Sequence, residues 1–219
     1  MERFRQQQRS RYEPLFGQLA HGQKPHTLLI TCCDSRISPN LITSTDPGEL
    51  FIVRNIGNLV PHASSPLAPA VSSAIEYSLL VLGVSDVIVC GHSACGAMKA
   101  LLSPTPPEGV PGVVSWLAEG KASLAGLAPN ATPEDAAKHN ALVQLRHALS
   151  NDALRRKYEA GEVKLHAWFY DVASSDVLEY DEKSGTWNPL GAELPSARDT
   201  KPEGDGVNHS APRQPAPVL

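Results

Sequence analysis

Residues 74–98, AIEYSLLVLGVSDVIVCGHSACGAM, hold the pattern that decides the fold. Their first part completes a run in which apolar side chains recur at helical spacing from Leu67 to Leu82. Gly83 then ends the helix, and the segment 86–90 (DVIVC) is apolar nearly throughout, as in a strand covered on both sides. A helix that leads directly into a buried strand indicates an α/β fold.

Further strands are expected on both sides of this segment. Three apolar runs resemble it, and a weaker one follows the last of them closely enough to form an antiparallel hairpin at the sheet edge; in chain order the four are TLLIT (27–31), LFIV (50–53), KLHAWF (164–169) and VLEY (177–180). The sequence therefore predicts a mainly parallel central sheet of four strands plus an antiparallel edge strand, with helices on both faces.

The helices are marked by their caps. The first should begin at Ser65, with Pro66 in its first turn. A second should open at the sequence TPED, with Thr132 as its cap and acidic residues near the positive end of the helix dipole. It continues through leucines at helical spacing, namely Leu142, Leu145 and Leu149. A short third helix should end at Gly161.

The chain divides into three parts. Residues 1–20 read as a helical arm whose apolar face is too small to be stable alone, so the arm should pack on something else. Residues 21–194 form the α/β domain, and residues 195–219, rich in Pro, Gly and charge, are expected to be a disordered tail.

Composition narrows the classes of function. A chain of 219 residues with 42% apolar content can build one well-buried domain. The net charge is −4 and the 19 Lys and Arg residues are scattered, which argues against a nucleic-acid partner. No run is apolar and long enough for a membrane span or a leader, so a soluble, cytoplasmic protein is expected. Its four cysteines should then be ligands or reactive groups rather than disulfides.

Polar residues follow two strands at their carboxyl ends. The first strand runs into CCDSR (32–36) and the third into CGHSACG (90–96), in which His92 and Cys95 are three apart. Neighbouring parallel strands would bring one cysteine of the first motif to the same place. One imidazole and two thiolates suit zinc, and a vacant fourth position is typical of a catalytic zinc site.

Each feature also has an ordinary explanation when it is taken alone. An H-x-x-C spacing arises often by chance, and Cys90 inside an apolar strand reads as a small core residue. Asp34 and Arg36 could form a surface ion pair of little value to stability. The combination, with both motifs at strand ends, favours a site.

These motifs resemble those of the β-class carbonic anhydrases, in the branch whose site is open at rest. The family pattern C-x-D-x-R fits only as Cys32, Asp34 and Arg36, which makes Cys32 the ligand and Cys33 the unspecified residue. The pattern G-H-x-x-C-G is matched in full by GHSACG. The resemblance also includes the segments GQKP, LFIVRNIGNLVP and HAWFYDV, and extends from about Phe16 to Trp187.

The resemblance implies reversible hydration of carbon dioxide to bicarbonate and a proton by zinc-bound hydroxide, with one Zn²⁺ per chain on Cys32, His92 and Cys95. Asp34 would orient the hydroxide, and Arg36 would keep Asp34 ionised and off the metal.

The resemblance also implies a substrate pocket, formed by Gln23 as a side-chain donor, Phe51, Ile56 and Tyr77 as walls, and Gly96. In this branch part of the wall comes from a partner subunit, which implies a homodimer or a dimer-based oligomer.

Two alternatives remain open at this stage. The same scaffold could act on another heteroallene, carbon disulfide or carbonyl sulfide, because the attack is the same. A non-catalytic zinc or thiol sensor built on Cys32, Cys33 and Cys95 is also conceivable, but it would not need Asp34, Arg36 or Gln23.

Two further groups of residues bear on regulation and proton transfer. One branch of the family binds a second bicarbonate with a Trp, an Arg and a Tyr; Arg54 and Tyr170 match, but Leu29 replaces the Trp, so we expect an open resting site. His62, His139 and His166 show no ligand spacing, although His62 could help pass protons.

Overall fold

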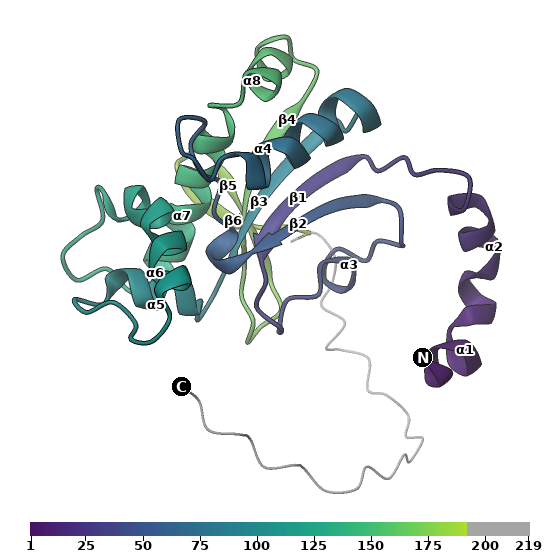
Figure 1. Cartoon of the computed structure of the whole chain (residues 1–219), viewed down its shortest axis with the longest axis horizontal. Helices are drawn as coiled ribbons and strands as arrows, with labels where there is room; N and C mark the ends of the chain where they lie inside the picture. The colour runs from purple at the N-terminus through teal and green to yellow at the C-terminus, as the bar shows by residue number, and fades with distance from the viewer. Residues whose placement is uncertain (192–219) are drawn as a thin grey trace, which may run out of the picture.

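A six-stranded sheet forms the centre of the protein (Figure 1). The computed structural model describes residues 1–191, so the tail predicted from residue 195 lies outside the described part. In chain order the strands are β1 (Thr27–Cys32), β2 (Leu50–Asn55), β3 (Asp86–His92), β4 (Lys164–Tyr170), β5 (Val177–Asp181) and β6 (Thr186–Pro189). The spatial order is β2-β1-β3-β4-β5-β6; the first four are parallel, and β5 and β6 are antiparallel.

The sixth strand corrects the predicted topology. We expected four parallel strands and one antiparallel edge strand, but β6 forms the edge and β5 lies inside it. The sequence of β6, TWNP, has no alternating pattern and ends in proline, which removes a backbone donor. Packing compensates for this weak propensity, because the Trp187 ring lies 5.4 Å from that of Tyr180, its partner in the register.

One face of the sheet carries the long helices. These are α4 (Pro69–Glu76) with its π-helical continuation η2 (Tyr77–Leu82), α7 (Pro133–Ala148) and α8 (Asp152–Glu159). Their apolar faces pack on strand residues of one parity, such as Leu28, Val87 and Ala167. The capping box of Thr132 with Asp135 confirms the predicted start of α7.

The helix predicted from Ser65 begins later, at Pro69. The Ser65 hydroxyl accepts a hydrogen bond from the Leu67 N–H in the preceding turn and donates one to Glu119. The end of the helix agrees with the prediction, since Gly83 adopts the left-handed conformation with φ of 73°.

The opposite face of the sheet is covered differently. Leu29, Ile88 and Cys90 lie there in a smaller buried cluster with Tyr170. The only described helix that contributes to this cluster is the four-residue α3 (Pro39–Ile42). Helices therefore occupy both faces, as predicted, but very unequally.

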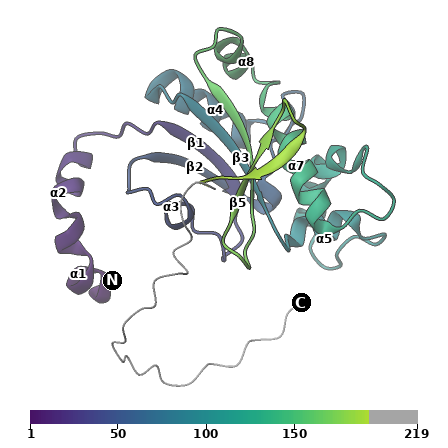
Figure 2. The ribbon, with the colours of Figure 1, turned by 180° about the vertical axis from the view of Figure 1, so that it is seen from behind.

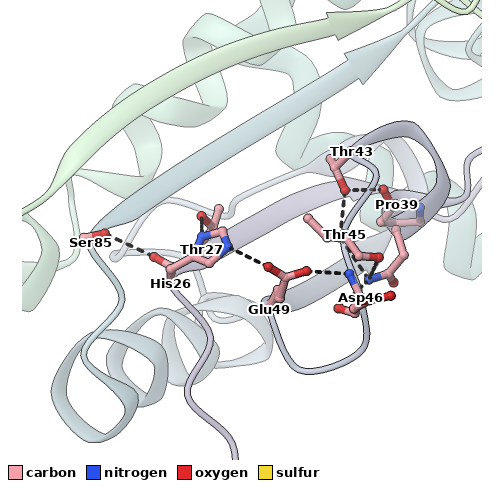
Figure 3. A network of polar contacts seen from close by, with 9 residues as sticks. His26, Thr27, Pro39, Thr43, Thr45, Asp46, Glu49 and Ser85 are labelled. Atoms are coloured by element: carbon pink, nitrogen blue, oxygen red, sulfur yellow. Dashed lines mark hydrogen bonds and ion pairs between the residues drawn. The ribbon is translucent and has the colours of Figure 1, made fainter. Parts of the chain in front are cut away.

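The segment between β1 and β2 is fastened by polar contacts at the amino ends of the strands (Figure 3). The Thr43 hydroxyl donates to the carbonyl of Pro39 at 2.8 Å. The His26 N–H donates to the carbonyl of Glu49 at 3.1 Å, and the Ser85 N–H donates to that of His26 at 3.0 Å. The two backbone bonds of His26 align the starts of β1, β2 and β3, so the carboxyl ends of the strands are aligned as well.

The N-terminal arm is helical, as predicted, and consists of α1 (Glu2–Gln7) and α2 (Arg9–Leu19). Neither helix has a buried residue, and Figures 1 and 2 show both standing away from the sheet. No helix among residues 1–191 has the length and apolar character needed to cross a membrane.

Candidate active site

The carboxyl ends of β1 and β3 bring three metal-ligating side chains together. β1 ends at Cys32 and β3 at His92, and these strands are parallel neighbours. The ligand atoms of Cys32, His92 and Cys95 all lie within 4.8 Å of one another, and all three residues are buried. The structure thus brings together the three residues that the strand ends and the family resemblance predicted as metal ligands.

A strained turn delivers Cys95 to this place. Ala94 has φ of 54°, in the left-handed region that a non-glycine residue seldom adopts. The turn is held because the Ser93 N–H donates to the Tyr170 carbonyl at 2.9 Å, and the Ser93 hydroxyl accepts from the Val172 N–H at 2.9 Å. Cys95 then precedes the first residue of α5 (Gly96–Leu102).

The hydrogen bonding of His92 fits a metal ligand. Its Nδ1 lies 2.9 Å from the Ser93 carbonyl, which can only accept, so Nδ1 carries the proton. The other nitrogen, Nε2, is buried and has no hydrogen-bond partner among residues 1–191. A buried nitrogen lone pair beside two cysteine sulfurs is what a bound zinc ion would satisfy.

The pKa values of the Cys32 and Cys95 thiols are shifted in opposite directions. A hydrogen bond from Cys95, with a further bond from the Gly57 N–H, lowers the pKa of Cys32 to about 4 against the opposing effect of burial. The pKa of Cys95 is raised, because it is hydrogen-bonded to Cys32 and because it is buried. The two shifts run in opposite directions, and a bound cation would favour the thiolate form of both sulfurs.

The other two cysteines lie outside this group. Cys33 follows the end of β1 and is exposed. Cys90 points to the opposite face of the sheet, and burial raises the pKa of its thiol to about 12. Cys90 is therefore a core residue, as predicted.

Asp34 and Arg36 form a bidentate ion pair at the edge of the ligand group. Nε and Nη2 of Arg36 donate to the two carboxylate oxygens of Asp34 at 2.9 and 2.8 Å. The same Nη2 donates to the carbonyl of Ala94 at 3.2 Å, which ties the pair to the turn before Cys95. The Arg36 guanidinium holds the pKa of Asp34 well below its ordinary value, so the carboxylate stays ionised.

Arg54 has a role that the sequence did not reveal. Its Nε donates to the Cys32 carbonyl at 3.2 Å and its Nη2 to the Asp34 carbonyl at 2.8 Å. The guanidinium on β2 therefore fixes the backbone of the CCD turn. Leu29 and Tyr170, the other two positions compared with a second bicarbonate site, are buried together in the cluster on the opposite face.

A mostly apolar cavity of about 310 Å³ opens beside the ligand group. Cys32 and Asp34 lie in its wall with Ile56 and Gly96, which were predicted to line the substrate pocket. The rest of the wall includes the apolar side chains of Ala97, Val113 and Leu117, from α5 and α6 (Pro111–Leu117).

The sequence profile described as carbonic anhydrase matches residues 27–177. The chain belongs to the β-carbonic anhydrase family. It is 40% identical over 190 residues to a carbonic anhydrase of Pseudomonas aeruginosa, which covers 84% of this chain and 86% of that protein. Carbonic anhydrase 1 of Escherichia coli O157:H7 is 37% identical over 186 residues, covering 82% and 84%.

Solved structures of β-carbonic anhydrases share the fold. The structure of the β-carbonic anhydrase CcaA superposes with a TM-score of 0.78 at 37% identity, covering 86% of this chain and 95% of that one. One from Sordaria macrospora, described as tetrameric, gives a TM-score of 0.67 at 29% identity, covering 78% and 88%. This chain is accordingly an enzyme of the family that hydrates carbon dioxide.

Three residues expected in a carbonic anhydrase pocket lie elsewhere in this single chain. Gln23 precedes β1, whose six residues span about 17 Å before Cys32 is reached. Phe51 pairs with Leu28 near the start of β2, and its ring lies 5.8 Å from that of Tyr77. None of Gln23, Phe51 and Tyr77 lines the cavity beside Cys32.

His62, His139 and His166, which show no ligand spacing in the sequence, do not belong to the Cys32, His92 and Cys95 group found among the described residues. His166 bridges two carboxylates, with Nδ1 2.6 Å from Glu179 Oε1 and Nε2 3.1 Å from Asp86 Oδ1. His62 lies beside His147, with 5.8 Å between the ring centres.

Proposed function

We propose that this carbonic anhydrase uses one zinc ion, held by Cys32, His92 and Cys95, to convert carbon dioxide and water reversibly to bicarbonate and a proton. The observation that carries the proposal is the unpartnered Nε2 of buried His92 beside two cysteine sulfurs, next to an ionised Asp34. A bound zinc ion lowers the pKa of a coordinated water toward neutrality, which makes a nucleophile available at physiological pH.

Asp34 and Arg36 prepare the attack. Oδ1 of Asp34 accepts from both the backbone N–H and Nε of Arg36, whereas Oδ2 accepts only from Nη2 and retains a lone pair that can accept the hydrogen of the attacking water. Arg36 prevents Asp34 from turning toward the thiolate ligands, because its own guanidinium is anchored on the Ala94 carbonyl. The dyad would thus orient the nucleophile and hold the Asp34 carboxylate away from a bound zinc ion.

The cavity suits a small uncharged substrate. Carbon dioxide has no charge to grip, so apolar walls such as Ile56, Val113 and Leu117 favour its entry. The bicarbonate product carries a negative charge beside ionised Asp34, and this repulsion favours its release. Gly96 lies in the same wall and has no side chain, so the space beside it stays open.

We further propose that the pocket is completed by a second copy of the chain in a homodimer. β2 is the outermost strand on its side of the sheet, and no described strand pairs with its free edge. Apolar side chains beside it are strongly exposed: Tyr77 by 44%, Leu80 by 62% and Val81 by 65%. A second copy docked there would cover this face, and each chain could supply its Gln23, Phe51 and Tyr77 to the cavity of the other. The arm α1–α2, which has no buried residue, would also gain a surface to pack on.

Stopped-flow hydration of carbon dioxide with a pH indicator tests the reaction. The zinc-loaded protein should hydrate carbon dioxide, lose activity when a chelator removes the metal, and regain it when zinc is returned. Hydrolysis of carbonyl sulfide or carbon disulfide in place of carbon dioxide hydration would show that the substrate is another heteroallene. Zinc binding with neither reaction would indicate a sensor.

Hybrid dimers test the shared pocket. Gln23→Ala should lower the rate about 100-fold or more, the loss typical of one oxyanion donor, and Cys32→Ser should abolish it. When the two variants are co-expressed, a hybrid dimer regains one complete site, because the Cys32→Ser chain supplies Gln23 to its partner. Co-expressed Arg36→Ala and Cys32→Ser chains serve as the control and should stay inactive, since each site keeps a lesion. A Gln23→Ala hybrid without recovered activity would contradict the shared pocket.

We also propose a cytoplasmic location, because all four cysteines are free in the described structure and three line the site, as a reducing compartment permits. Cell fractionation with an antibody against the protein would test it.

A further inference from the structure

The loop from Asn55 to Val60 brings a backbone donor to the Cys32 sulfur. The Gly57 N–H donates to Cys32 Sγ at 3.4 Å. Gly57 has φ of 78°, and a Cβ at this position would lie 2.8 Å from the Cβ of Ala97. The peptide therefore approaches the sulfur in a conformation and a space that only glycine tolerates, and small displacements would break the bond.

Two side-chain amides of α7 hold this loop at separate points. Asn140 Nδ2 donates to the Gly57 carbonyl at 3.0 Å, and Gln144 Oε1 accepts from the Val60 N–H at 2.7 Å. The two residues are four apart, so they occupy one face of the helix. Both are 0% exposed, and neither belongs to the Cys32, His92 and Cys95 group or lines the cavity.

The amides are themselves fixed by a third buried side chain. The Ser123 hydroxyl donates to Asn140 Oδ1 at 2.6 Å, and Gln144 Nε2 donates to Ser123 Oγ and to Asn140 Oδ1, both at 3.1 Å. Ser123 is also 0% exposed. These bonds assign the oxygen and the nitrogen of each amide, so the Asn140 donor can only face Gly57.

Packing alone does not explain these polar residues. Apolar side chains would fill the same interior positions of α7 without needing partners, as its neighbours Ala141 and Leu145 do. A fully satisfied buried polar network instead specifies one arrangement of the groups that it joins. Here one end of the network holds the carbonyl of Gly57, the residue whose N–H donates to the Cys32 sulfur.

We infer that Asn140 and Gln144 are positioning residues of the metal site, which act through the Gly57–Val60 loop to hold a hydrogen bond on the Cys32 sulfur. The inference rests on the proposed zinc site. A hydrogen bond to a ligating thiolate fixes its orientation and tunes its electron donation, and the loss of such a partner typically lowers metal affinity 10- to 100-fold.

The test measures zinc affinity by competition with a chromophoric chelator, together with the thiolate-to-cobalt absorption band of the cobalt-substituted protein. Asn140→Ala should weaken zinc binding about 10- to 100-fold and shift the band. Asn140→Asp should do the same at constant size, because a carboxylate cannot donate to the Gly57 carbonyl. Gln144→Ala, which releases the loop at Val60, is measured in parallel so that poor folding of one variant does not end the test.

Leu145→Ala provides the matched control on the same helix. It removes core packing and should lower the melting temperature, yet its zinc affinity should stay within about twofold, because an apolar side chain makes no hydrogen bond to the loop or to the amides. Unchanged affinity and spectra in the folded Asn140 and Gln144 variants would overturn the inference, as would an equal loss in Leu145→Ala. Failure of the unaltered protein to bind zinc would instead refute the proposed function.

Discussion

Cys32→Ser should lose both zinc and carbon dioxide hydration, whereas Cys33→Ser should keep one zinc per chain and most of the rate. The two residues are adjacent, but the Cys32 sulfur lies within 4.8 Å of the ligand atoms of His92 and Cys95, and Cys33 is exposed beyond the strand. A serine hydroxyl does not ionise near neutral pH and is a poor replacement for a thiolate ligand. Metal content by atomic emission and stopped-flow hydration give the two readouts.

The pair of variants is its own control, because both make the same chemical change one residue apart. Cys33 lines the cavity, so a modest change in rate is compatible with its position. Equal loss of zinc in Cys32→Ser and Cys33→Ser would contradict the assignment of the ligand.

Arg36→Ala should reduce hydration by about 100-fold or more while zinc stays bound, because it frees Asp34 to occupy the fourth ligand position. The variant leaves all three ligands in place but removes three anchors, to both Asp34 oxygens and to the Ala94 carbonyl. A crystal structure of the zinc-loaded variant should show the Asp34 carboxylate on the metal or turned away from its place in the present structure. Arg36→Lys would keep the charge without the bidentate geometry and should restore only part of the rate.

The folding of the Arg36→Ala variant must be checked in parallel, although the expected loss of stability is small. The Arg36 side chain is 46% exposed, and surface pairs contribute little. Because the folded-state pKa of Asp34 is depressed, the pair stabilises the fold above about pH 4, the ordinary range of an unfolded aspartate, and this contribution is lost as the pH falls further. A normally active Arg36→Ala enzyme would show that Arg36 is not needed to keep Asp34 off the metal.

The sequence predicted the structure best where residue type and a local hydrophobic pattern indicated the same element. The parallel strands were recognisable because both faces of a central strand are apolar, as in β1. His92 and Cys95 were placed with a cysteine of the first motif because parallel neighbours end at the same edge of a sheet, and the family resemblance selected Cys32. The start of α7 could be read from Thr132 because its capping box is a local interaction.

Local pattern was misleading where packing outweighed propensity. The strand β6 forms although its four residues have little strand propensity, because Trp187 packs on Phe169 and Tyr180. The helix start at Pro69 rather than Ser65 has the same kind of cause, since the Ser65 hydroxyl is engaged in a turn and by the distant Glu119.

By itself the sequence predicted the strands and the Cys32, His92 and Cys95 group that the structure brings together, and it paired Asp34 with Arg36, because these depend on residue type, on short spacing and on the resemblance to the family motifs. Only the tertiary structure decided what surrounds them: that Arg54 holds the CCD backbone, that Asn140 and Gln144 on α7 hold Gly57, and that Gln23 lies far from the cavity of its own chain. These contacts join residues that are from 20 to 84 positions apart. Their hydrogen-bond partners are backbone groups, which carry no signature in the sequence, so they become visible only when the chain has packed.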